Sequence, residues 1–278
     1  MNCCSYCGHT IPKYDAACGK ILLGTPTWNN RDVVLITLTG LRTEAYRLRQ
    51  CGFDVSVVVV DNGSTDGTRD LLEAASDVYK IYNSENVGIA PARNQLIDYS
   101  LYLKTKYTFF VDDDVYVVPH SVAEMANYLW QHQHEAFCLG VDFSIRTDNI
   151  SCADRCCHRI YAPRLNELTA HGNYGIFLTE TFKQFRFDPE FGPGWGWEDY
   201  DLGMQIQHAT GLNCHVIQLR HYHAVRNSWT RMANQGVNMN QNFHERTEYI
   251  RKKWAGVEKY REFLESIKQY DSLQEPSH

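Results

Sequence analysis

Two apolar runs of this chain end directly in acidic residues, and no other feature of the sequence constrains the fold as strongly. Residues 55–60 lead into Asp61, and residues 107–111 lead into Asp112–Asp114. Both runs are rich in β-branched or aromatic residues, which favours strands, and the Asn-Gly-Ser that follows Asp61 is typical of a turn. Because a carboxylate is costly to bury without a partner, we expect a polar ligand or an ion beside these strand ends.

Predicted strands alternate with predicted helices along the first half of the chain. Strands are predicted at residues 21–25, 55–60, 80–82 and 107–111, and helices at residues 31–50, 65–75 and 90–104. This alternation indicates βαβ units and a largely parallel sheet, whose ligands gather at the carboxyl ends of the strands. The expected fold class is α/β, with Asp61 and Asp112–Asp114 close enough for one ligand to contact both.

The length and composition are those of a globular protein with a sizeable core. The chain has 278 residues, of which 44% are hydrophobic and 13% aromatic, enough for one large domain or two small ones. No run approaches the roughly 20 apolar residues that cross a bilayer, and the N-terminus lacks the basic start and apolar core of a signal peptide. We therefore expect no transmembrane segment and a cytoplasmic location. The net charge of −6 argues against a protein that binds mainly to nucleic-acid backbones.

A second acidic cluster follows an aromatic, glycine-rich stretch. Residues 192–197 (Gly-Pro-Gly-Trp-Gly-Trp) precede Glu198 and Asp199. An indole face offers a platform for the C–H face of a sugar, and a hydroxyl near neutral pH needs a general base within hydrogen-bond reach. Asp199 is the candidate base for a hydroxyl of such a sugar, which would act as the acceptor in a transfer reaction, and Glu198 is the catalytic neighbour that holds the acceptor. Contacts to the acceptor are also predicted for Trp195, Trp197 and Asp201. The alternative is an ordinary helix N-terminus, where the helix dipole favours acidic side chains.

Five segments resemble the motifs of family-2 glycosyltransferases and occur in the same order. They are Pro26–Asn29 (Pro-Thr-Trp-Asn), residues 58–68 around Asp-Asn-Gly-Ser, Asn86–Asn94, Asp112–Asp114 and residues 194–202. The last segment resembles the G-W-G-x-E-D-x-D acceptor motif of the β-1,4-galactosyltransferase group. The resemblance covers roughly residues 20–225. It implies the GT-A fold, which is Rossmann-like, with a mixed but mostly parallel central sheet flanked by helices.

The resemblance also implies a metal-dependent hexosyl- or pentosyltransferase whose donor is a nucleoside-diphosphate sugar. Contacts to this donor are implied for Pro26, Thr27, Asp61, Arg93, Asn94, Asp112 and Asp113. Asp61 would bind the base of the nucleotide. Asp114 would be a direct ligand of Mn²⁺ or Mg²⁺, while Asp112 would share the metal or contact the ribose. The alternative to donor binding is that Asp61 only forms a turn and that Arg93 and Asn94 only cap a helix.

Two histidines follow a predicted strand at residues 216–219. Related enzymes with the Glu-Asp motif place a histidine after this strand as a third metal ligand, so the resemblance implies His223 or else His221 in this role. Imidazole suits manganese or zinc better than magnesium. The alternative is a pair of surface histidines.

The cysteine-rich residues 1–19 depart from the resemblance. Cys4, Cys7 and Cys18, with His9 as a candidate fourth ligand, resemble an incomplete zinc ribbon, because a C-x-x-C-G turn can hold zinc by two thiolates. Residues 152–158 contain three cysteines and a histidine and are a further candidate. The alternative is a set of free thiols, as expected in a reducing compartment.

The predicted organisation has three parts. Residues 1–19 form the cysteine-rich segment, residues 20–235 the catalytic domain, and residues 236–278 a helical extension. Within the extension, residues 240–270 are predicted to form an amphipathic helix. This helix would pack on the domain, dimerise or lie on a membrane surface, and in the last case the protein would be membrane-peripheral.

The predicted reaction is in-line attack of an acceptor hydroxyl on the anomeric carbon, with inversion at that carbon. Asp199 would take the proton, and the metal would stabilise the departing diphosphate. The acceptor would be a glycan, a lipid-linked sugar, a small molecule or modified DNA. The alternatives are a phage-type transferase acting on hydroxymethylated DNA and a nucleotidyltransferase. A non-catalytic sugar-binding module would not need Asp112–Asp114.

Overall fold

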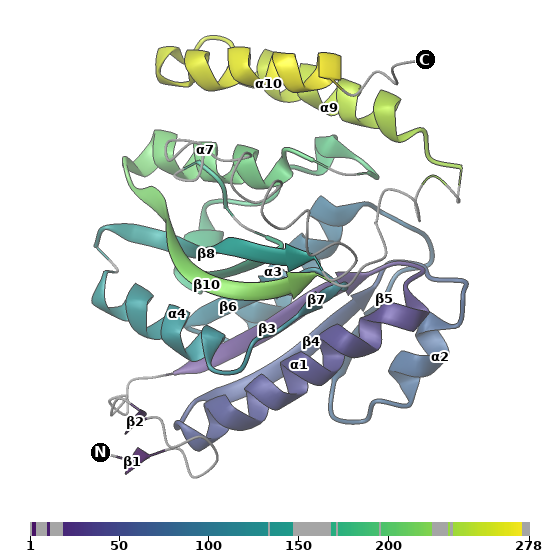
Figure 1. Ribbon diagram of the computed structural model, residues 1–278, viewed down its shortest axis with the longest axis vertical. Coiled ribbons are helices and arrows are strands. Elements are labelled where there is room, and N and C mark those ends of the chain that lie inside the picture. Colours follow the sequence, from purple (N-terminus) through teal and green to yellow (C-terminus); the bar gives the residue numbers. More distant parts are fainter. Residues whose placement is uncertain are drawn as a thin grey trace.

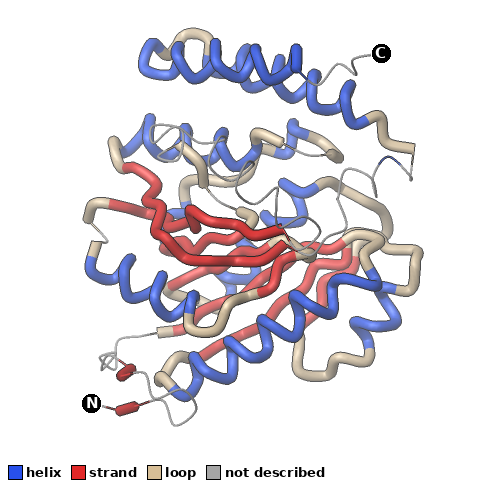
Figure 2. The backbone as a smooth tube through the Cα atoms, in the orientation of Figure 1, coloured by secondary structure: helices blue, strands red, loops and turns tan. Residues whose placement is uncertain are grey.

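An eight-stranded sheet forms the centre of the molecule in the computed structural model (Figure 1, Figure 2). The structure describes residues 2–3, 10–11, 19–132, 134–146, 168–170, 172–194, 196–223, 233 and 236–273. The strands of the sheet are β3 (Lys20–Thr27), β4 (Asp54–Asp61), β5 (Tyr79–Tyr82), β6 (Tyr107–Val111), β7 (Val115–Tyr116), β8 (Ala136–Arg146), β9 (Tyr174–Leu178) and β10 (Asn213–His223). A separate pair joins β1 (Asn2–Cys3) to β2 (Thr10–Ile11).

The sheet is mixed, with the spatial order β5-β4-β3-β6-β9-β8-β10-β7. β3 pairs in parallel with β4 and β6, β4 pairs in parallel with β5, and β8 pairs in parallel with β10. β9 runs antiparallel to β6 and β8, and β7 runs antiparallel to β10. The predicted α/β class with a mixed, mostly parallel sheet is therefore confirmed.

Helices cover both faces of this sheet (Figure 1). They are α1 (Arg31–Gln50), α2 (Thr68–Glu73), α3 (Ile89–Tyr102), α4 (Ser121–Gln131) and α7 (Glu198–Thr210). Successive strand residues face opposite sides, so Leu23 and Val59 pack with α1 and α4, whereas Leu22 and Val58 pack with α3 and α7. Because both faces are covered, the central strands are continuous apolar runs rather than alternating ones.

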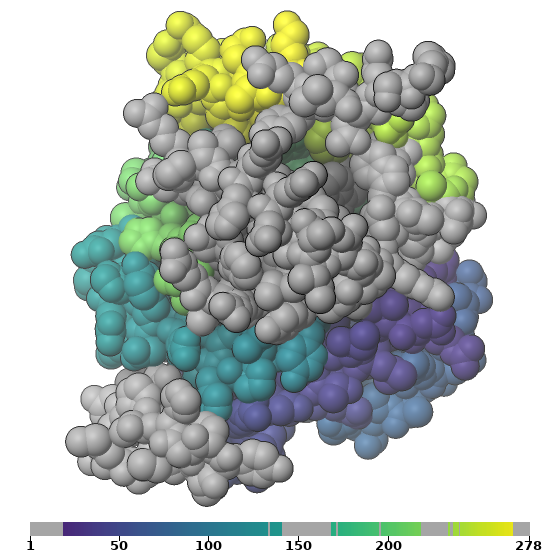
Figure 3. All heavy atoms as spheres, in the orientation of Figure 1, coloured from purple at the N-terminus to yellow at the C-terminus, as the bar shows by residue number. Residues whose placement is uncertain are grey.

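Two C-terminal helices, α9 (Met239–Trp254) and α10 (Arg261–Leu273), add a layer on α7. Their apolar side chains pack against Tyr200 and Met204 of α7. In the space-filling view α10 lies at the end of the molecule opposite α1 and α2 (Figure 3). The sequence predicts one helix over residues 240–270, and this is wrong. The two helices are separated by a turn that contains Gly256, because glycine has a low helix propensity.

Two further predictions concern the absence of a transmembrane segment and the presence of a zinc site. None of the helices in the described ranges has both the length and the apolar character that crossing a membrane requires. The zinc ligands predicted from the sequence, Cys4, Cys7, Cys18 and His9, lie outside the described residues, as does the cluster at residues 152–158. The zinc site and the division into three parts therefore stay predictions.

Candidate active site

The ends of β3 and β4 bring three residues of the predicted donor site together. Pro26 and Thr27 close β3, and Thr27 is the register partner of Asp61 at the end of β4. Asp61 is fully buried. One of its oxygens accepts a hydrogen bond from the Ser64 backbone N–H at 3.0 Å, and the other pairs with Arg69 Nε at 3.0 Å. The protein itself thus compensates this buried carboxylate, and contact between Asp61 and a nucleotide base stays a prediction.

Asn62 is a buried residue at this edge that the sequence reasoning did not single out. Its Nδ2 donates to Asn86 Oδ1 at 2.8 Å and to the Gly88 carbonyl at 3.2 Å, while its Oδ1 accepts from Asn83 Nδ2 at 2.9 Å. These bonds connect the loop after β4, the loop after β5 and the start of α3. A side-chain amide both donates and accepts, so an Asn placed between the strand-ending Asp61 and Gly63 is the sequence signal that could have found it.

The Asp triplet lies between β6 and β7. Asp113 and Asp114 are buried, whereas the side chain of Asp112 is 30% exposed. Thr27 Oγ1 donates to Asp113 Oδ2 at 2.6 Å, and Asn30 Nδ2 donates to the Asp113 carbonyl at 3.4 Å. The loop is therefore fixed to the end of β3, and Thr27 contacts the triplet directly.

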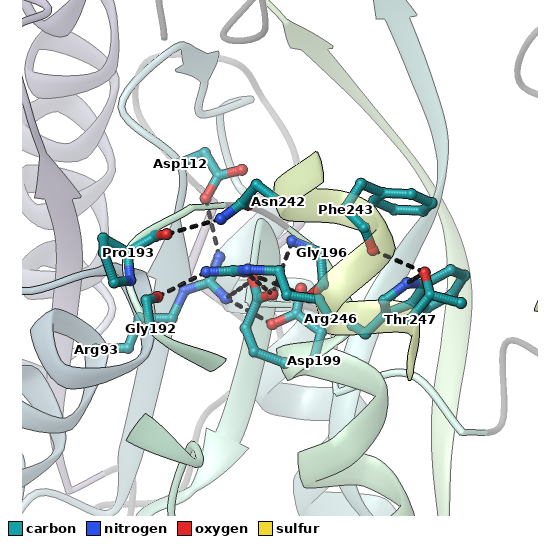
Figure 4. A network of polar contacts seen from close by, with 12 residues as sticks. Arg93, Asp112, Gly192, Pro193, Gly196, Asp199, Asn242, Phe243, Arg246 and Thr247 are labelled. Carbon is teal, nitrogen blue, oxygen red and sulfur yellow. Dashed lines mark hydrogen bonds and ion pairs between the residues drawn. The ribbon is translucent and has the colours of Figure 1, made fainter. Parts of the chain in front are cut away.

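Arg93 of α3 is the centre of a buried ion-pair network (Figure 4). Its Nη2 donates to Asp112 Oδ1 at 3.1 Å, and its Nη1 donates to Asp199 Oδ1 at 2.6 Å and to Glu198 Oε1 at 3.2 Å. Burial alone would lower the pKa of Arg93, but the three surrounding carboxylates outweigh burial and raise it. This guanidinium thus joins the first acidic cluster to the second.

Asn94, the next residue of α3, is engaged by the backbone of Phe187. Its Nδ2 donates to the Phe187 carbonyl at 2.8 Å, and its Oδ1 accepts from the Phe187 N–H at 3.1 Å. Through these two bonds, Asn94 holds α3 against the backbone at Phe187. The predicted contact of Asn94 with the donor stays a prediction.

Asp199 lies in the first turn of α7, so the helix N-terminus expected as the plainer alternative is present. Burial raises the pKa of Asp199 to about 7; Arg93 opposes this shift, and the charges of Glu198 and Asp112 add to it. The backbone at Gly172 passes directly over the Arg93–Asp199 pair, and a Cβ there would lie 2.6 Å from Asp199 Oδ1. A carboxyl group with this pKa changes protonation near neutral pH, as a general base requires.

Glu198 and Asp201 are both buried, and both accept hydrogen bonds from protein donors. Glu198 Oε2 accepts from the Gly196 N–H at 3.1 Å and lies 3.7 Å from Arg246 Nη1. Asp201 accepts from Trp254 Nε1 at 2.8 Å, from Lys253 Nζ at 2.8 Å and from Gln205 Nε2 at 2.7 Å. Asp201 therefore anchors α9 to α7, and its predicted contact with the acceptor stays a prediction.

Of the two tryptophans predicted to contact the acceptor, Trp195 lies outside the described residues. Trp197 packs against Phe243 of α9 and Phe263 of α10, with ring centroids 5.4 and 6.0 Å away. Its Nε1 donates to Thr247 Oγ1 at 2.9 Å. The indole is half-buried in this contact, and its role as a sugar platform stays a prediction.

The residues expected to hold a metal offer hard oxygen donors at one strand end. Among the described residues, no group of three or more His, Cys, Asp or Glu side chains is arranged as a closed metal site. Mg²⁺ and similar ions are commonly held by one or two carboxylates together with substrate phosphates, and Asp112 and Asp114 fit that chemistry. The backbone register pairs His223 with Val115, the residue after Asp114, and His221 lies two residues earlier on β10.

A comparison with family models decides the assignment. Residues 23–164 match the model of Glycosyl transferase family 2, and this match covers just over half of the chain. The chain belongs to glycosyl transferase family 2. The matched region contains Asp61, Arg93 and Asp112–Asp114, whereas α7 and α9 lie beyond it. The enzyme class predicted from the sequence is thus confirmed at the level of the family.

One curated relative is similar over a short stretch. A protein of Bacillus subtilis (strain 168) with the name "Putative teichuronic acid biosynthesis glycosyltransferase TuaG" is 30% identical over 94 residues. This stretch is 32% of the present chain and spans about a third (34%) of that relative.

Solved structures show the same fold at low sequence identity. TarS of S. aureus matches with a TM-score of 0.59 and 17% identity, covering 86% of this family-2 chain and 40% of TarS. The mannosyltransferase PcManGT of Pyrobaculum calidifontis, in complex with GDP-Man and Mn²⁺, matches with a TM-score of 0.55 and 18% identity over 82% of this chain and 64% of its own. GalNAc-T7 with UDP, GalNAc and Mn²⁺ matches with a TM-score of 0.58 and 15% identity, over 84% of this chain and 48% of its own. The predicted GT-A fold is confirmed.

Proposed function

We propose that this family-2 protein transfers a sugar from a nucleoside-diphosphate sugar to an acceptor hydroxyl, with a divalent metal at the Asp triplet. The observation that carries the proposal is the Arg93 network, in which one buried guanidinium contacts Asp112 and Asp199 at 3.1 and 2.6 Å. A donor bound beside Asp112 and an acceptor bound beside Asp199 would be neighbours. Neighbouring reactants in fixed orientation are the main requirement for group transfer.

On the donor side, we assign nucleotide contacts to Pro26, Thr27 and Asp61 at the ends of β3 and β4. Asp112 and Asp114 would hold Mn²⁺ or Mg²⁺, with His223 or His221 as a further candidate ligand from β10. A bound ion would act as a Lewis acid on the diphosphate. Structures of the same fold hold GDP-Man with Mn²⁺ or UDP with Mn²⁺, which supports this assignment without fixing the sugar.

On the acceptor side, Asp199 takes the proton from the attacking hydroxyl. Its pKa of about 7 lets the carboxylate form near neutral pH and still accept a proton. The hydroxyl oxygen would attack the anomeric carbon opposite the bond to the diphosphate, which leaves with its bonding electrons, so the anomeric carbon is inverted. Glu198 and the preceding Gly-Trp residues would shape the acceptor site, as in the Glu-Asp motif of the β-1,4-galactosyltransferase group. The Glu198-Asp199 pair at the start of α7 supports this grouping.

The deciding experiment is a donor and acceptor screen with purified protein. Nucleoside-diphosphate sugars are incubated with Mn²⁺ or Mg²⁺, and release of nucleoside diphosphate is measured with and without glycans, lipid-linked sugars, small glycosides or hydroxymethylated DNA. We expect metal-dependent release of the diphosphate that one acceptor class accelerates. Acceleration by hydroxymethylated DNA would identify the phage-type alternative. Release of nucleoside monophosphate would indicate a nucleotidyltransferase, and no turnover of any donor would refute the proposal.

A further inference from the structure

The loop that precedes Asp199 contains several residues with positive φ angles. Its φ angles are positive at Gly192 (65°), Gly194 (140°), Gly196 (111°) and Trp197 (69°). Glycine adopts such angles readily, but a tryptophan in the left-handed region costs on the order of 1–3 kcal/mol and persists only where its surroundings hold it. The residues that hold this loop are therefore relevant to the position of Asp199.

One face of α9 makes the contacts that hold the loop (Figure 4). Asn242 Nδ2 donates to the Pro193 carbonyl at 3.0 Å, and Thr247 Oγ1 accepts from the Trp197 indole at 2.9 Å. Arg246 donates from Nη2 to the Gly192 carbonyl at 2.6 Å and from Nη1 to the Gly196 carbonyl at 3.4 Å. Residues four apart on a helix share a face, so Asn242 and Arg246 reach the same side of the loop.

Arg246 also faces the acidic pair at the start of α7. Its side chain is only 3% exposed, and Nη1 lies 3.7 Å from Glu198 Oε2. Arg93 donates to the other oxygen of Glu198 at 3.2 Å, so Glu198 lies between two buried guanidinium groups. Buried arginines are rare unless they are paired, and a two-pronged guanidinium can fix the positions of several acceptors at once.

We propose that Arg246 is a positioning residue that fixes the glycine-rich loop and Glu198, and thereby orients Asp199 toward the acceptor hydroxyl. Its catalytic consequence rests on the proposed function. α9 is then part of the catalytic unit, although it lies beyond residues 23–164 that match the family model.

The attachment of α9 to the domain does not depend on Arg246. Trp254 and Lys253 bind the buried Asp201 about two turns further along the helix. Ile250 and Trp254 belong to the apolar cluster that packs against α7. Arg246 instead contacts the loop and Glu198, so loss of its side chain should loosen the loop while α9 stays docked.

Two variants of Arg246 test the proposal against a matched control. Arg246→Gln removes the charge and the two-pronged donor, and Arg246→Lys keeps the charge alone. Arg251→Lys on the same helix is the control, because Arg251 pairs with the exposed Glu248. Amide hydrogen exchange of residues 192–199 is measured for each protein, together with kcat and the KM values for donor and acceptor.

We expect exchange in residues 192–199 of Arg246→Gln to be about 10-fold faster, since two charge-assisted bonds to the loop are lost. The kcat for transfer should fall about 10–100-fold with an unchanged KM for the donor, because misplacement of a catalytic group costs rate more than donor binding. Arg246→Lys should recover part of both effects, and Arg251→Lys should match the wild type.

Wild-type exchange and kcat in Arg246→Gln would overturn the proposal. So would a uniform rise of exchange over α7, α9 and the loop together, because Arg246 would then support the fold in general. If Arg246→Gln fails to fold, Asn242→Ala removes the bond to the Pro193 carbonyl, and faster exchange confined to the loop is again required. A wild-type protein that turns over no sugar nucleotide would refute the proposed function, whereas the exchange measurement would still decide whether Arg246 holds the loop.

Discussion

Replacement of Asp199 by Asn is expected to lower activity and to raise stability at the same time. The amide is similar in size and keeps an oxygen that Arg93 can donate to, but it cannot take a proton from the acceptor. Loss of a positioned general base typically costs about 10²–10⁴-fold in rate. We therefore expect turnover to fall by this factor while the KM for the donor stays close to the wild-type value.

The effect on stability follows from the raised pKa of Asp199. Burial, as the largest cause, raises it from 3.8 to about 7, and each pKa unit corresponds to about 1.36 kcal/mol. Between these two values the unfolded chain is ionised while the folded protein still binds the proton, so the free energy of unfolding decreases as the pH rises. Above pH 7 the full penalty of up to about 4 kcal/mol applies. As the pH falls toward 4 the penalty disappears.

The assay is denaturant unfolding of wild type and Asp199→Asn at pH 8, 6 and 4, combined with a pH profile of kcat/KM. The variant should be more stable at pH 8, by up to about 4 kcal/mol, and the difference should shrink to near zero at pH 4. Wild-type kcat/KM should rise with pH to a plateau above about 7, and the variant should lack this rise. Asp98→Asn is the control, because Asp98 pairs with Arg186 at the surface.

A variant that is less stable than wild type by the same amount at all three pH values would refute the reasoning. Asp199 would then be ionised throughout, and its pair with Arg93 would contribute to stability instead of reducing it. Near-normal turnover in the variant would separately exclude Asp199 as the base, and the base would have to be sought at Glu198 or Asp201.

Three further predictions test other parts of the molecule. Asp114→Asn should remove most Mn²⁺-dependent turnover without lowering the melting temperature, because an amide cannot balance the charge of the ion; full activity in excess chelator would contradict this. Gly203→Ala should destabilise the protein by about 1–3 kcal/mol in denaturant unfolding, because the added Cβ would lie 1.8 Å from the Leu168 carbonyl oxygen. Gly256→Ala is the control and should have little effect, because no atom lies within 4 Å of the added Cβ. If the N-terminal thiolates hold zinc, metal analysis of the wild type should give near-stoichiometric zinc and Cys4→Ser should contain less; a zinc-free wild type would leave these residues as plain thiols.

The first half of the fold could be predicted from the sequence because its signals are local. The β-branched residues 55–60 lie within β4, and the predicted helices at residues 31–50 and 90–104 correspond to α1 and α3. β9 was not predicted, and its place between β6 and β8 depends on pairings between distant segments, such as Phe109 with Ile176. Such pairings leave no periodic signal in the strands themselves.

The sequence predicted many residues of the candidate site but not the ion pairs that join them. Arg93 was assigned to the donor side, whereas the structure also joins it to Glu198 and Asp199, which follow it by 105 and 106 positions. A buried arginine requires anionic partners, and the sequence contains two acidic clusters. The pairing of Arg93 with both clusters could therefore have been predicted. Arg246 carried no such signal, because in sequence it is one of several charged residues of an amphipathic helix.

The two sides of the candidate site also differ in what family membership can say about them. The proposed donor side, with Asp61 and Asp112–Asp114, lies within residues 23–164 that match the family model. The proposed acceptor side begins at the loop of residues 192–197, and α9, which lies still further along the chain, donates hydrogen bonds to this loop. Arg93, in the matched region, pairs with Glu198 and Asp199 of the proposed acceptor side. In the proposed function, family membership therefore bears on the donor, whereas α7, α9 and the loop of residues 192–197 would select the acceptor. Exchange of these later segments between family members should then change the acceptor.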